Sequence, residues 1–436
     1  MISDKTMHPG NDVMSQAQAL LDFLDTSPSP WHAVDTASQQ LQQRGYIRLD
    51  ETEAWQLEPG GKYYVTRSDA SIIAFIMGQK PAAESGFRIV GAHTDSPGLR
   101  LKPKPAYASD GLARLGVEVY GGPILATFAD RDLSLAGRVY VSDGKGTATH
   151  LVRFNEPLVR LPNLAIHMNR DVNDNGLKFN KQTELPLIFS FAQDAAQAQE
   201  RFLSLVADVA ELDPASVLTY EFTAWDTQKG SFWGADKEFI ANSQLDNLAS
   251  CHAALRALQA VESPQSTCVC ALFDHEEVGS QSATGAGGSF LADVLSRIEP
   301  QTESQRRAFA RSFFISADMA HAYNPSFPNA YEPQHKVMVN GGPVIKTNAN
   351  QRYSTNAETA ARFMRLCNEA EVPFQQYVHR TDLGCGSTIG PILAAKLGMP
   401  CVDVGSPMWA MHSIRESAGT LDHTYMISAL QAHFSS

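Results

Sequence analysis

A chain of 436 residues is too long for one ordinary hydrophobic core, so we expect two domains, one of them inserted into the other. The net charge of −12 argues against a nucleic-acid partner, which would require a basic surface. No apolar run approaches the ~18 residues of a membrane span, and the N-terminus carries no apolar signal segment. The six cysteines form no C-x-x-C pair, which is typical of reduced thiols. We therefore expect a cytoplasmic protein.

The first part of the chain predicts two helices followed by strands. Residues 14–45 carry apolar side chains at helical spacing, broken by TSPSPWHA. The strand-like runs KYYVTR, SIIAFIMG and FRIVGAH follow. From about residue 99 to 233 the apolar runs are short and β-rich, and only residues 194–210 are clearly helical. After residue 242, helices alternate with buried strands to the end of the chain, which is typical of a largely parallel sheet.

These patterns predict an α/β protein with a mixed, largely parallel sheet flanked by helices, interrupted by a β-rich insert. We expect the α/β domain to be discontinuous and to contain residues 1–98 and 235–436. The insert would then contain residues 99–234.

Polar side chains of metal-binding type follow the apolar runs of the α/β part. FRIVGAH and FFISAD each end in one, TCVCALF leads into DHEEVGS, CVDVGSPMWAMH reaches a histidine after a short loop, and SQLDNL places an aspartate at the start of a helix. Because ligands bind at the carboxyl ends of parallel strands, we expect these side chains to converge. They are His93, Asp95, Asp246, Glu276, Glu277, Asp318 and His412.

Two imidazoles and three carboxylates from this set suit zinc, and also manganese or cobalt. Two divalent ions would offset the charge of the carboxylates, and such a pair polarises a carbonyl and generates hydroxide at neutral pH. One glutamate of the adjacent pair would then bind metal, and the other would take the proton from water. Asp95 fits a carboxylate that accepts the far N–H of His93. The alternative is that each residue is an ordinary cap, turn or packing residue, but their joint occurrence at successive strand ends favours a metal site.

Other catalytic motifs fit less well. HEEVG has Gly279 where H-E-x-x-H requires histidine, TGAGGS lacks the G-x-G-x-x-G spacing, and no G-x-S-x-G occurs. The run TDLGCGSTIGPILAAKLGMP predicts a glycine-rich turn entering a helix, which is either simple architecture or a substrate loop.

Six motifs resemble those of the aspartyl aminopeptidases, a family of dinuclear zinc aminopeptidases: GAHTDSPG, SQLDNL, DHEEVGS, ISADMAHAYNP, GGPVIKTNANQRYST and GSPMWAMHSIRE. The resemblance runs over essentially the whole chain and includes LAIHMNRDVN in the insert. It implies a zinc-peptidase-like fold with an inserted dimerisation domain, two divalent ions, and removal of N-terminal Asp or Glu from peptides.

The resemblance also implies a role for each matching residue. Glu276 would be the general base and Asp95 the partner of His93. His167 would reach the active site of a neighbouring subunit and help to stabilise the tetrahedral intermediate. The assembly would be a dodecamer built from dimers, whose chamber admits peptides with free N-termini. The metal ligands would be His93 and Asp318 for one ion, Glu277 and His412 for the other, and Asp246 between them.

An acidic substrate side chain requires a cation nearby, because a desolvated carboxylate is costly when unpaired. Lys346 is the first candidate, with Arg380 and Tyr353 behind it; the alternative is that the two cations are ordinary surface charges. Three other functions stay open: an aminopeptidase of broader specificity, an N-acyl amino acid deacylase or carboxypeptidase on the same scaffold, and a non-catalytic peptide-binding assembly.

Overall fold

The computed structural model describes residues 10–142 and 146–436. Residues 1–9, on which part of the expectation about a signal segment falls, lie outside the described residues. The chain divides into two compact units. Unit 1 contains Met1–Asp95, Gly230–Met411 and Glu416–Ser436, and unit 2 contains Ser96–Lys229 and His412–Arg415. The divisions fall after residues 95 and 229, a few residues before the boundaries at 98 and 234 that we expect from the sequence.

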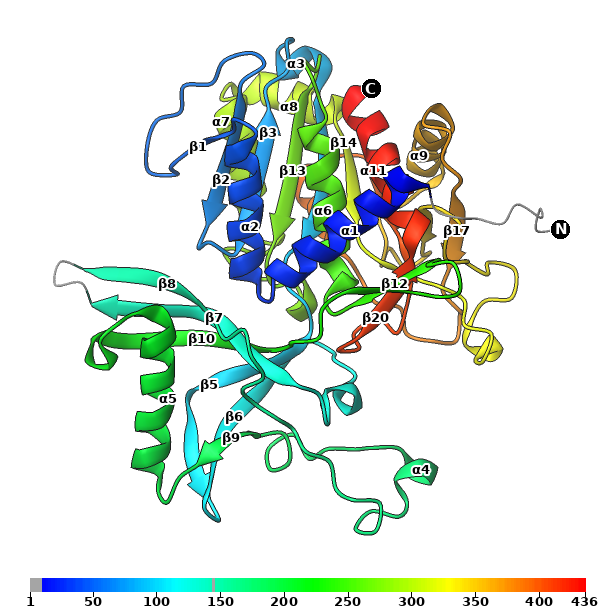
Figure 1. Cartoon of the computed structure of the whole chain (residues 1–436). Coiled ribbons are helices and arrows are strands. Elements are labelled where there is room, and N and C mark those ends of the chain that lie inside the picture. The colour runs from blue at the N-terminus through cyan, green and yellow to red at the C-terminus, as the bar shows by residue number, and fades with distance from the viewer. Residues whose placement is uncertain (1–9, 143–145) are drawn as a thin grey trace. The chain divides into compact units, whose positions relative to one another are not determined.

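Unit 1 is built on a nine-stranded mixed sheet (Figure 1). Its four central strands, β13, β4, β14 and β18, pair in parallel, and antiparallel pairs occur on either side of them. The strands, in sheet order, are β1 (Ile47–Arg48), β2 (Lys62–Arg67), β3 (Ser71–Ile76), β13 (Thr267–Phe273), β4 (Phe87–His93), β14 (Phe313–Ala317), β18 (Cys401–Gly405), β16 (Val344–Thr347) and β17 (Gln375–Val378).

Helices cover both faces of this sheet, as Figure 1 shows. The helices α1 (Asn11–Thr26), α2 (Pro30–Gln43), α6 (Leu245–Gln259), α9 (Ala357–Glu369) and α11 (Thr420–Ser435) share one hydrophobic core. On the opposite face a second core contains residues of α3 (Ala82–Ser85), α7 (Phe290–Ile298), α8 (Thr302–Arg311) and α10 (Ile389–Leu397). This arrangement confirms the predicted fold class.

The strand β13 illustrates why its apolar run forms a central strand. Cys268, Cys270 and Leu272 enter one core, whereas the alternate residues Val269 and Ala271 enter the other. Because successive side chains of a strand point to opposite faces, a run that is buried on both faces must be apolar throughout. The predicted break between the first two helices is also present, where Ser29 caps α2 by accepting the amide of His32.

A smaller five-stranded sheet completes unit 1. Its strands, in order, are β11 (Ser231–Trp233), β12 (Phe239–Asn242), β20 (Glu416–Gly419), β19 (Pro407–Trp409) and β15 (Ala320–His321).

Unit 2 is built on a six-stranded antiparallel sheet that packs against the helix α5 (Ala195–Ala210). Phe202 and Val206 of this helix enter the core of the unit, and Asp194 caps its first turn by accepting the amide of Gln197. The strands, in sheet order, are β8 (Thr147–Arg153), β7 (Leu133–Ser142), β10 (Val217–Asp226), β5 (Gly98–Ser109), β6 (Leu112–Tyr120) and β9 (Leu187–Phe191).

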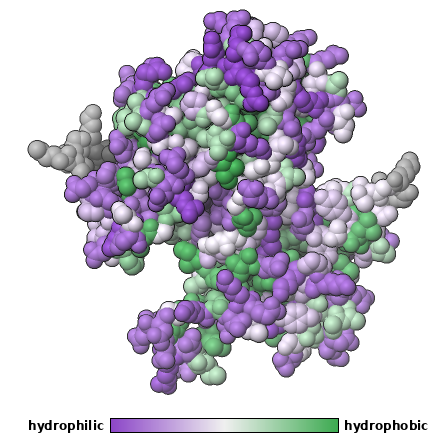
Figure 2. Space-filling view, turned by 180° about the vertical axis from the view of Figure 1, so that it is seen from behind, coloured by the Kyte–Doolittle hydropathy of each residue, from purple (hydrophilic) through white to green (hydrophobic). Residues whose placement is uncertain are grey.

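The remaining described elements are short: η1 (Leu125–Phe128), α4 (Val172–Asn175), η2 (Pro214–Ser216), η3 (Glu276–Val278) and η4 (Pro328–Ala330). The face drawn in Figure 2 is predominantly hydrophilic, with hydrophobic residues gathered in patches. Among the described helices, none combines the length and apolar character that crossing a membrane requires.

Candidate metal centre

The carboxyl edge of the central parallel strands gathers several predicted site residues. His93 is the last residue of β4, and Asp318 directly follows β14, which pairs with β4 in parallel. Glu276 and Glu277 begin the short helix η3 after β13, the other parallel neighbour of β4. Asp246 lies in the first turn of α6. Parallel pairing explains the convergence, because each chain segment leaves the sheet at the same edge.

His93 lies at the centre of this group. Its Nε2 atom is 3.6 Å from Oδ1 of Asp246 and 3.5 Å from Oδ1 of Asp318. The three residues offer ligand atoms that lie within 4.8 Å of one another, and the same holds for His93, Glu276 and Glu277. The His93 side chain is 2% exposed and that of Asp246 is 4% exposed. Burial at this level makes an uncompensated cluster of carboxylates costly.

Asp95 connects His93 to the two glutamates. Its Oδ1 and Oδ2 atoms accept the backbone N–H groups of Glu276 and Glu277, each at 3.1 Å. Its Oδ1 atom also lies 3.4 Å from Nδ1 of His93, and its carbonyl oxygen lies 3.0 Å from the same nitrogen. A proton on Nδ1 therefore faces Asp95, and Nε2 faces Asp246 and Asp318.

Burial and mutual repulsion perturb the acids. Burial raises the pKa of Glu276 to about 8; His93 opposes this rise, and Asp318 and other nearby carboxylates add to it. Burial also raises the pKa of Glu277 well above its usual range, with a further contribution from Asp246. For Asp318, burial alone would raise the pKa, but the Lys346 ammonium and His93 outweigh it and hold the pKa below its usual range.

The donor set fits a divalent cation. Carboxylate oxygens and an imidazole nitrogen are ligands that zinc takes in proteins. The acids of the cluster outnumber the nearby cationic side chains. The pKa of His93 shows this excess of negative charge: burial alone would lower it, but Asp318 and Asp95 raise it well above the usual value. Bound cations would satisfy the same negative charge.

Lys346 is deeply buried beside this cluster. Its ammonium donates to the carbonyl oxygens of Asp318 and Met319, at 3.0 and 3.1 Å, and lies 3.4 Å from Oδ2 of Asp318. It also lies 5.1 Å from the centre of the Tyr353 ring, which is itself buried. With a side chain only 2% exposed, Lys346 is not an ordinary surface charge, so that alternative is wrong.

Arg380 has a different environment from Lys346. Its side chain is 39% exposed, pairs with Asp382 at 2.7 Å, and donates to the carbonyl oxygen of Asn329. It therefore behaves as a surface cation that already has a partner.

Two predicted site residues belong to unit 2. His412 follows Met411, the last residue of its stretch of unit 1, and its Nδ1 atom lies 3.1 Å from the carbonyl oxygen of Gly122. His167 is exposed in the long connection between β8 and β9. The roles of both residues stay predictions.

Glu416 and Asn247 also hold residues of the cluster in place, although the sequence did not indicate them. Glu416 is 2% exposed, and its Oε2 atom accepts the backbone N–H of Asp246 at 3.0 Å. The Asn247 side chain donates to the carbonyl oxygen of Ala317, next to Asp318, at 2.9 Å. Both residues lie within quoted motifs, but no residue spacing indicates a contact between a side chain and a distant backbone group.

A mixed α/β sheet that gathers acids and a histidine of metal-binding type at its carboxyl edge is the arrangement of a metal-dependent enzyme. Residues 23–434 match the family described as aminopeptidase I zinc metalloprotease (M18). The chain belongs to this M18 family of zinc metallo-aminopeptidases, which confirms the predicted resemblance at the level of the family.

Individual relatives agree with this assignment. The chain is 50% identical over 428 residues to a probable M18 family aminopeptidase 2 from Stutzerimonas stutzeri, covering 96% of this chain and 98% of the relative. It is 38% identical to a chain in the cryo-EM structure of the Ape4 and Nbr1 complex, with a TM-score of 0.93 and coverage of 97% of this chain and 86% of that one. A chain of the S. cerevisiae mApe1 dodecamer is 27% identical, with a TM-score of 0.85 and 97% coverage of both chains.

Proposed function

We propose that this M18 aminopeptidase removes N-terminal Asp or Glu from peptides, with two divalent ions, most simply Zn²⁺, bound in the centre described above. The observation that carries the proposal is that Asp95 holds Glu276 and Glu277 beside the His93 cluster. Metal binding alone would require only one glutamate at this position, so the second glutamate is available as a base. We assign metal binding to His93, Asp246, Glu277, Asp318 and His412.

Glu276 is the general base in this proposal. Zinc held by these residues would polarise the scissile carbonyl and lower the pKa of the attacking water. Glu276 accepts the proton from the attacking water and then delivers it to the leaving amine. Asp95 keeps the Glu276 backbone in place, and His167 of a neighbouring subunit donates to the oxyanion.

Lys346 is the cation that we assign to the acidic side chain of the substrate. It is a buried ammonium beside the metal cluster, and its contact with Oδ2 of Asp318 is the longest of its three polar contacts. A substrate carboxylate in place of that contact would form a charge-assisted hydrogen bond. Tyr353 forms the wall behind the ammonium. Arg380 is the second candidate for this cation. It ranks below Lys346 because its ion pair with Asp382 would have to break before it could bind the substrate.

We further propose a cytoplasmic homo-oligomer, a dodecamer built from dimers that unit 2 joins. The mApe1 relative is a dodecamer. Large apolar side chains of unit 2 are exposed: Leu164 is 63%, Met168 75% and Phe191 76% exposed. Such residues on a single chain are suited to burial against a second copy. All six cysteines are free thiols, which agrees with a reducing compartment.

The experiment that tests the function measures initial hydrolysis rates on matched peptides with free N-termini that begin with Asp, Glu, Leu or Lys. We expect Asp and Glu peptides to be cleaved fastest, chelation to abolish cleavage, and added Zn²⁺ to restore it. Equal rates for all four peptides, or a preference for Leu, would leave a broad aminopeptidase and contradict the acidic pocket.

An acetylated copy of the Asp peptide separates the remaining alternatives. An aminopeptidase requires the free α-amine and fails on this peptide, whereas an N-acyl amino acid deacylase cleaves it. A non-catalytic binding assembly would bind metal and peptide and turn over neither form.

A further inference from the structure

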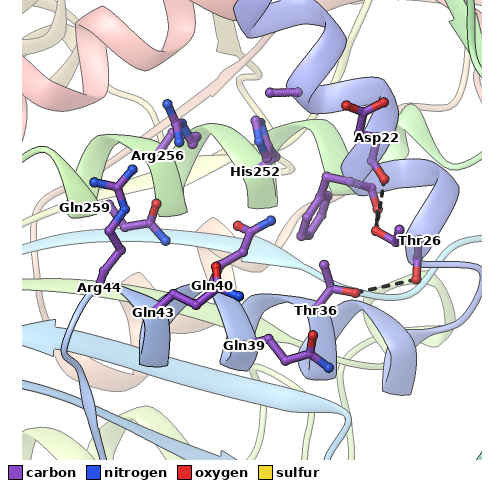
Figure 3. Close-up of a pocket in the computed structure, with 12 residues that line it drawn as sticks. Asp22, Thr26, Thr36, Gln39, Gln40, Gln43, Arg44, His252, Arg256 and Gln259 are labelled. Atoms are coloured by element: carbon purple, nitrogen blue, oxygen red, sulfur yellow. Dashed lines mark hydrogen bonds between the residues drawn. The ribbon is translucent and has the colours of Figure 1, made fainter.

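A separate cavity lies between α1, α2 and α6 (Figure 3). Its volume is about 420 Å³, and none of the residues assigned to the metal centre lines it. Asp246 of the metal centre and Arg256 of the cavity lie near opposite ends of α6, so this helix separates the two sites. Asp246 and Asn247 have non-helical backbone angles, so the regular helix from Leu248 to Arg256 corresponds to ~12 Å. The cavity is therefore not a part of the proposed substrate site.

Hydrogen-bond donors without partners gather at one end of this cavity. Figure 3 shows Arg44, Arg256 and Gln259 together there. Within residues 10–142 and 146–436, neither guanidinium forms an ion pair or a side-chain hydrogen bond. The Nε2 atom of Gln259 is buried and has no acceptor among the same residues. A buried donor without an acceptor is destabilising, so this end of the cavity is suited to a group with acceptor oxygens.

The charges of the lining favour an anion at this end. His252 lies in the lining, and its Nδ1 atom is 2.8 Å from Nε2 of His423. Burial lowers the pKa of both imidazoles, so this pair is neutral and the positive charge comes from the two guanidinium groups. Asp22 is the carboxylate among the described lining residues; it accepts a hydrogen bond from Gln18 at 2.8 Å and lies at the other end in Figure 3.

We infer that this cavity binds a small oxyanion, of the phosphate or carboxylate class, through Arg44, Arg256 and Gln259. Guanidinium groups bind such oxyanions through paired N–H donors in a fixed planar fork. The ligand acts at a site distinct from the metal centre, and the inference does not depend on the proposed peptide specificity.

The test is calorimetric titration of the zinc-loaded enzyme with inorganic phosphate and, separately, with succinate. We expect one of these anions to bind saturably at the cavity. Arg44→Gln and Arg256→Gln should each weaken that binding at least tenfold, which corresponds to about 1.4 kcal/mol. Arg306→Gln is the matched control, because it removes an exposed arginine of α8 that does not line the cavity. Two variants are used because Arg44 is exposed and its replacement leaves the packing of α6 intact.

The outcome decides both the site and the ligand class. Weakened phosphate binding in the two cavity variants, with succinate inactive, assigns a phosphoryl ligand, and the reverse assigns a carboxylate ligand. Unchanged peptide hydrolysis and zinc content in both variants would show that the metal centre is intact. Binding that is equal in all four proteins would place the anion at the metals and overturn the inference, as would the absence of saturable binding of either anion to the wild type.

Discussion

The carboxylate of Asp95 accepts the backbone N–H of Glu276 at 3.1 Å and thereby fixes the start of the glutamate pair. Its second oxygen does the same for Glu277, and its first oxygen also approaches the ring nitrogen of His93. One fully buried side chain thus connects two strand ends of the sheet. Its replacement should affect the imidazole and both glutamates together.

For Asp95→Asn we expect the zinc affinity to fall ~10- to 100-fold, as is typical when a partner of a metal ligand is lost. The amide has one acceptor oxygen for two backbone donors, and its NH₂ group would face the second N–H. Zinc titration of the metal-free enzyme, followed by hydrolysis, measures this change. Asp208→Asn, on the exposed side of α5, is the control. An unchanged zinc affinity would remove Asp95 from this role.

For Glu276→Gln we expect kcat to fall ~10²- to 10⁴-fold while the zinc content stays the same, because glutamine cannot accept the proton. Glu277→Gln should instead lose zinc, because this residue is assigned to metal binding. The comparison requires zinc analysis and single-substrate kinetics on both variants. Normal turnover by zinc-loaded Glu276→Gln would exclude this residue as the base.

For Lys346→Met we expect the preference for Asp over Leu at the substrate N-terminus to fall roughly 10- to 100-fold, the size of a lost charge-assisted hydrogen bond. Competition between the two peptides measures the ratio of kcat/KM values directly. A different result, in which all substrates slow equally and zinc is lost, would mean that Lys346 serves only to hold Asp318. Arg380→Gln is the comparison variant and should leave the ratio close to that of the wild type.

For His167→Ala we expect kcat to fall by about 10²- to 10³-fold, the usual effect of removing one donor to an oxyanion. Because His167 is assigned to the site of a neighbour, co-assembly with Glu276→Gln subunits should recover part of the activity. Mixed sites would then contain an intact Glu276 and an intact His167 from different chains. No recovery in co-purified mixed assemblies would contradict action between subunits.

The buried His433 predicts a pH dependence of stability away from the metal centre. Its Nε2 atom donates to the carbonyl oxygen of Ile89 at 3.2 Å, and burial lowers its pKa to about 3. Below pH ~6.5 this histidine is protonated in the unfolded chain but stays neutral in the native chain. The free energy of unfolding therefore falls as the pH falls from ~6.5 toward 3.

Denaturant titrations at pH 7 and pH 5.5 test this effect. The His433→Gln variant should lose about 1 kcal/mol less than the wild type between the two pH values, because it lacks the titrating group. His150→Gln, which removes a half-exposed imidazole of unit 2, is the control for loss of a histidine. An equal loss in the wild type and His433→Gln would contradict the assignment.

The strand ends could be predicted from the sequence. An unbroken apolar run such as TCVCALF forms a strand only where both faces are buried, and parallel strands bring their carboxyl ends to one edge. His93, Asp318 and the glutamate pair were therefore expected to meet, and the structure brings them together with Asp246. The M18 family was likewise recognisable from local motifs, because five of the six motifs contain one or more of the predicted metal-site residues.

The tertiary structure decided what local patterns do not encode. The burial of Lys346, the acceptance of the Asp246 amide by Glu416, and the cavity at Arg256 all depend on which distant segments pack together. Residues 412–415 group with unit 2 although residues on both sides of them belong to unit 1. Periodicity and spacing report which face a residue occupies within its own element. The partner that a side chain meets across the core is determined by packing of the whole chain, because such contacts join segments far apart in the sequence: 28 residues separate Lys346 from Asp318, and 170 separate Asp246 from Glu416.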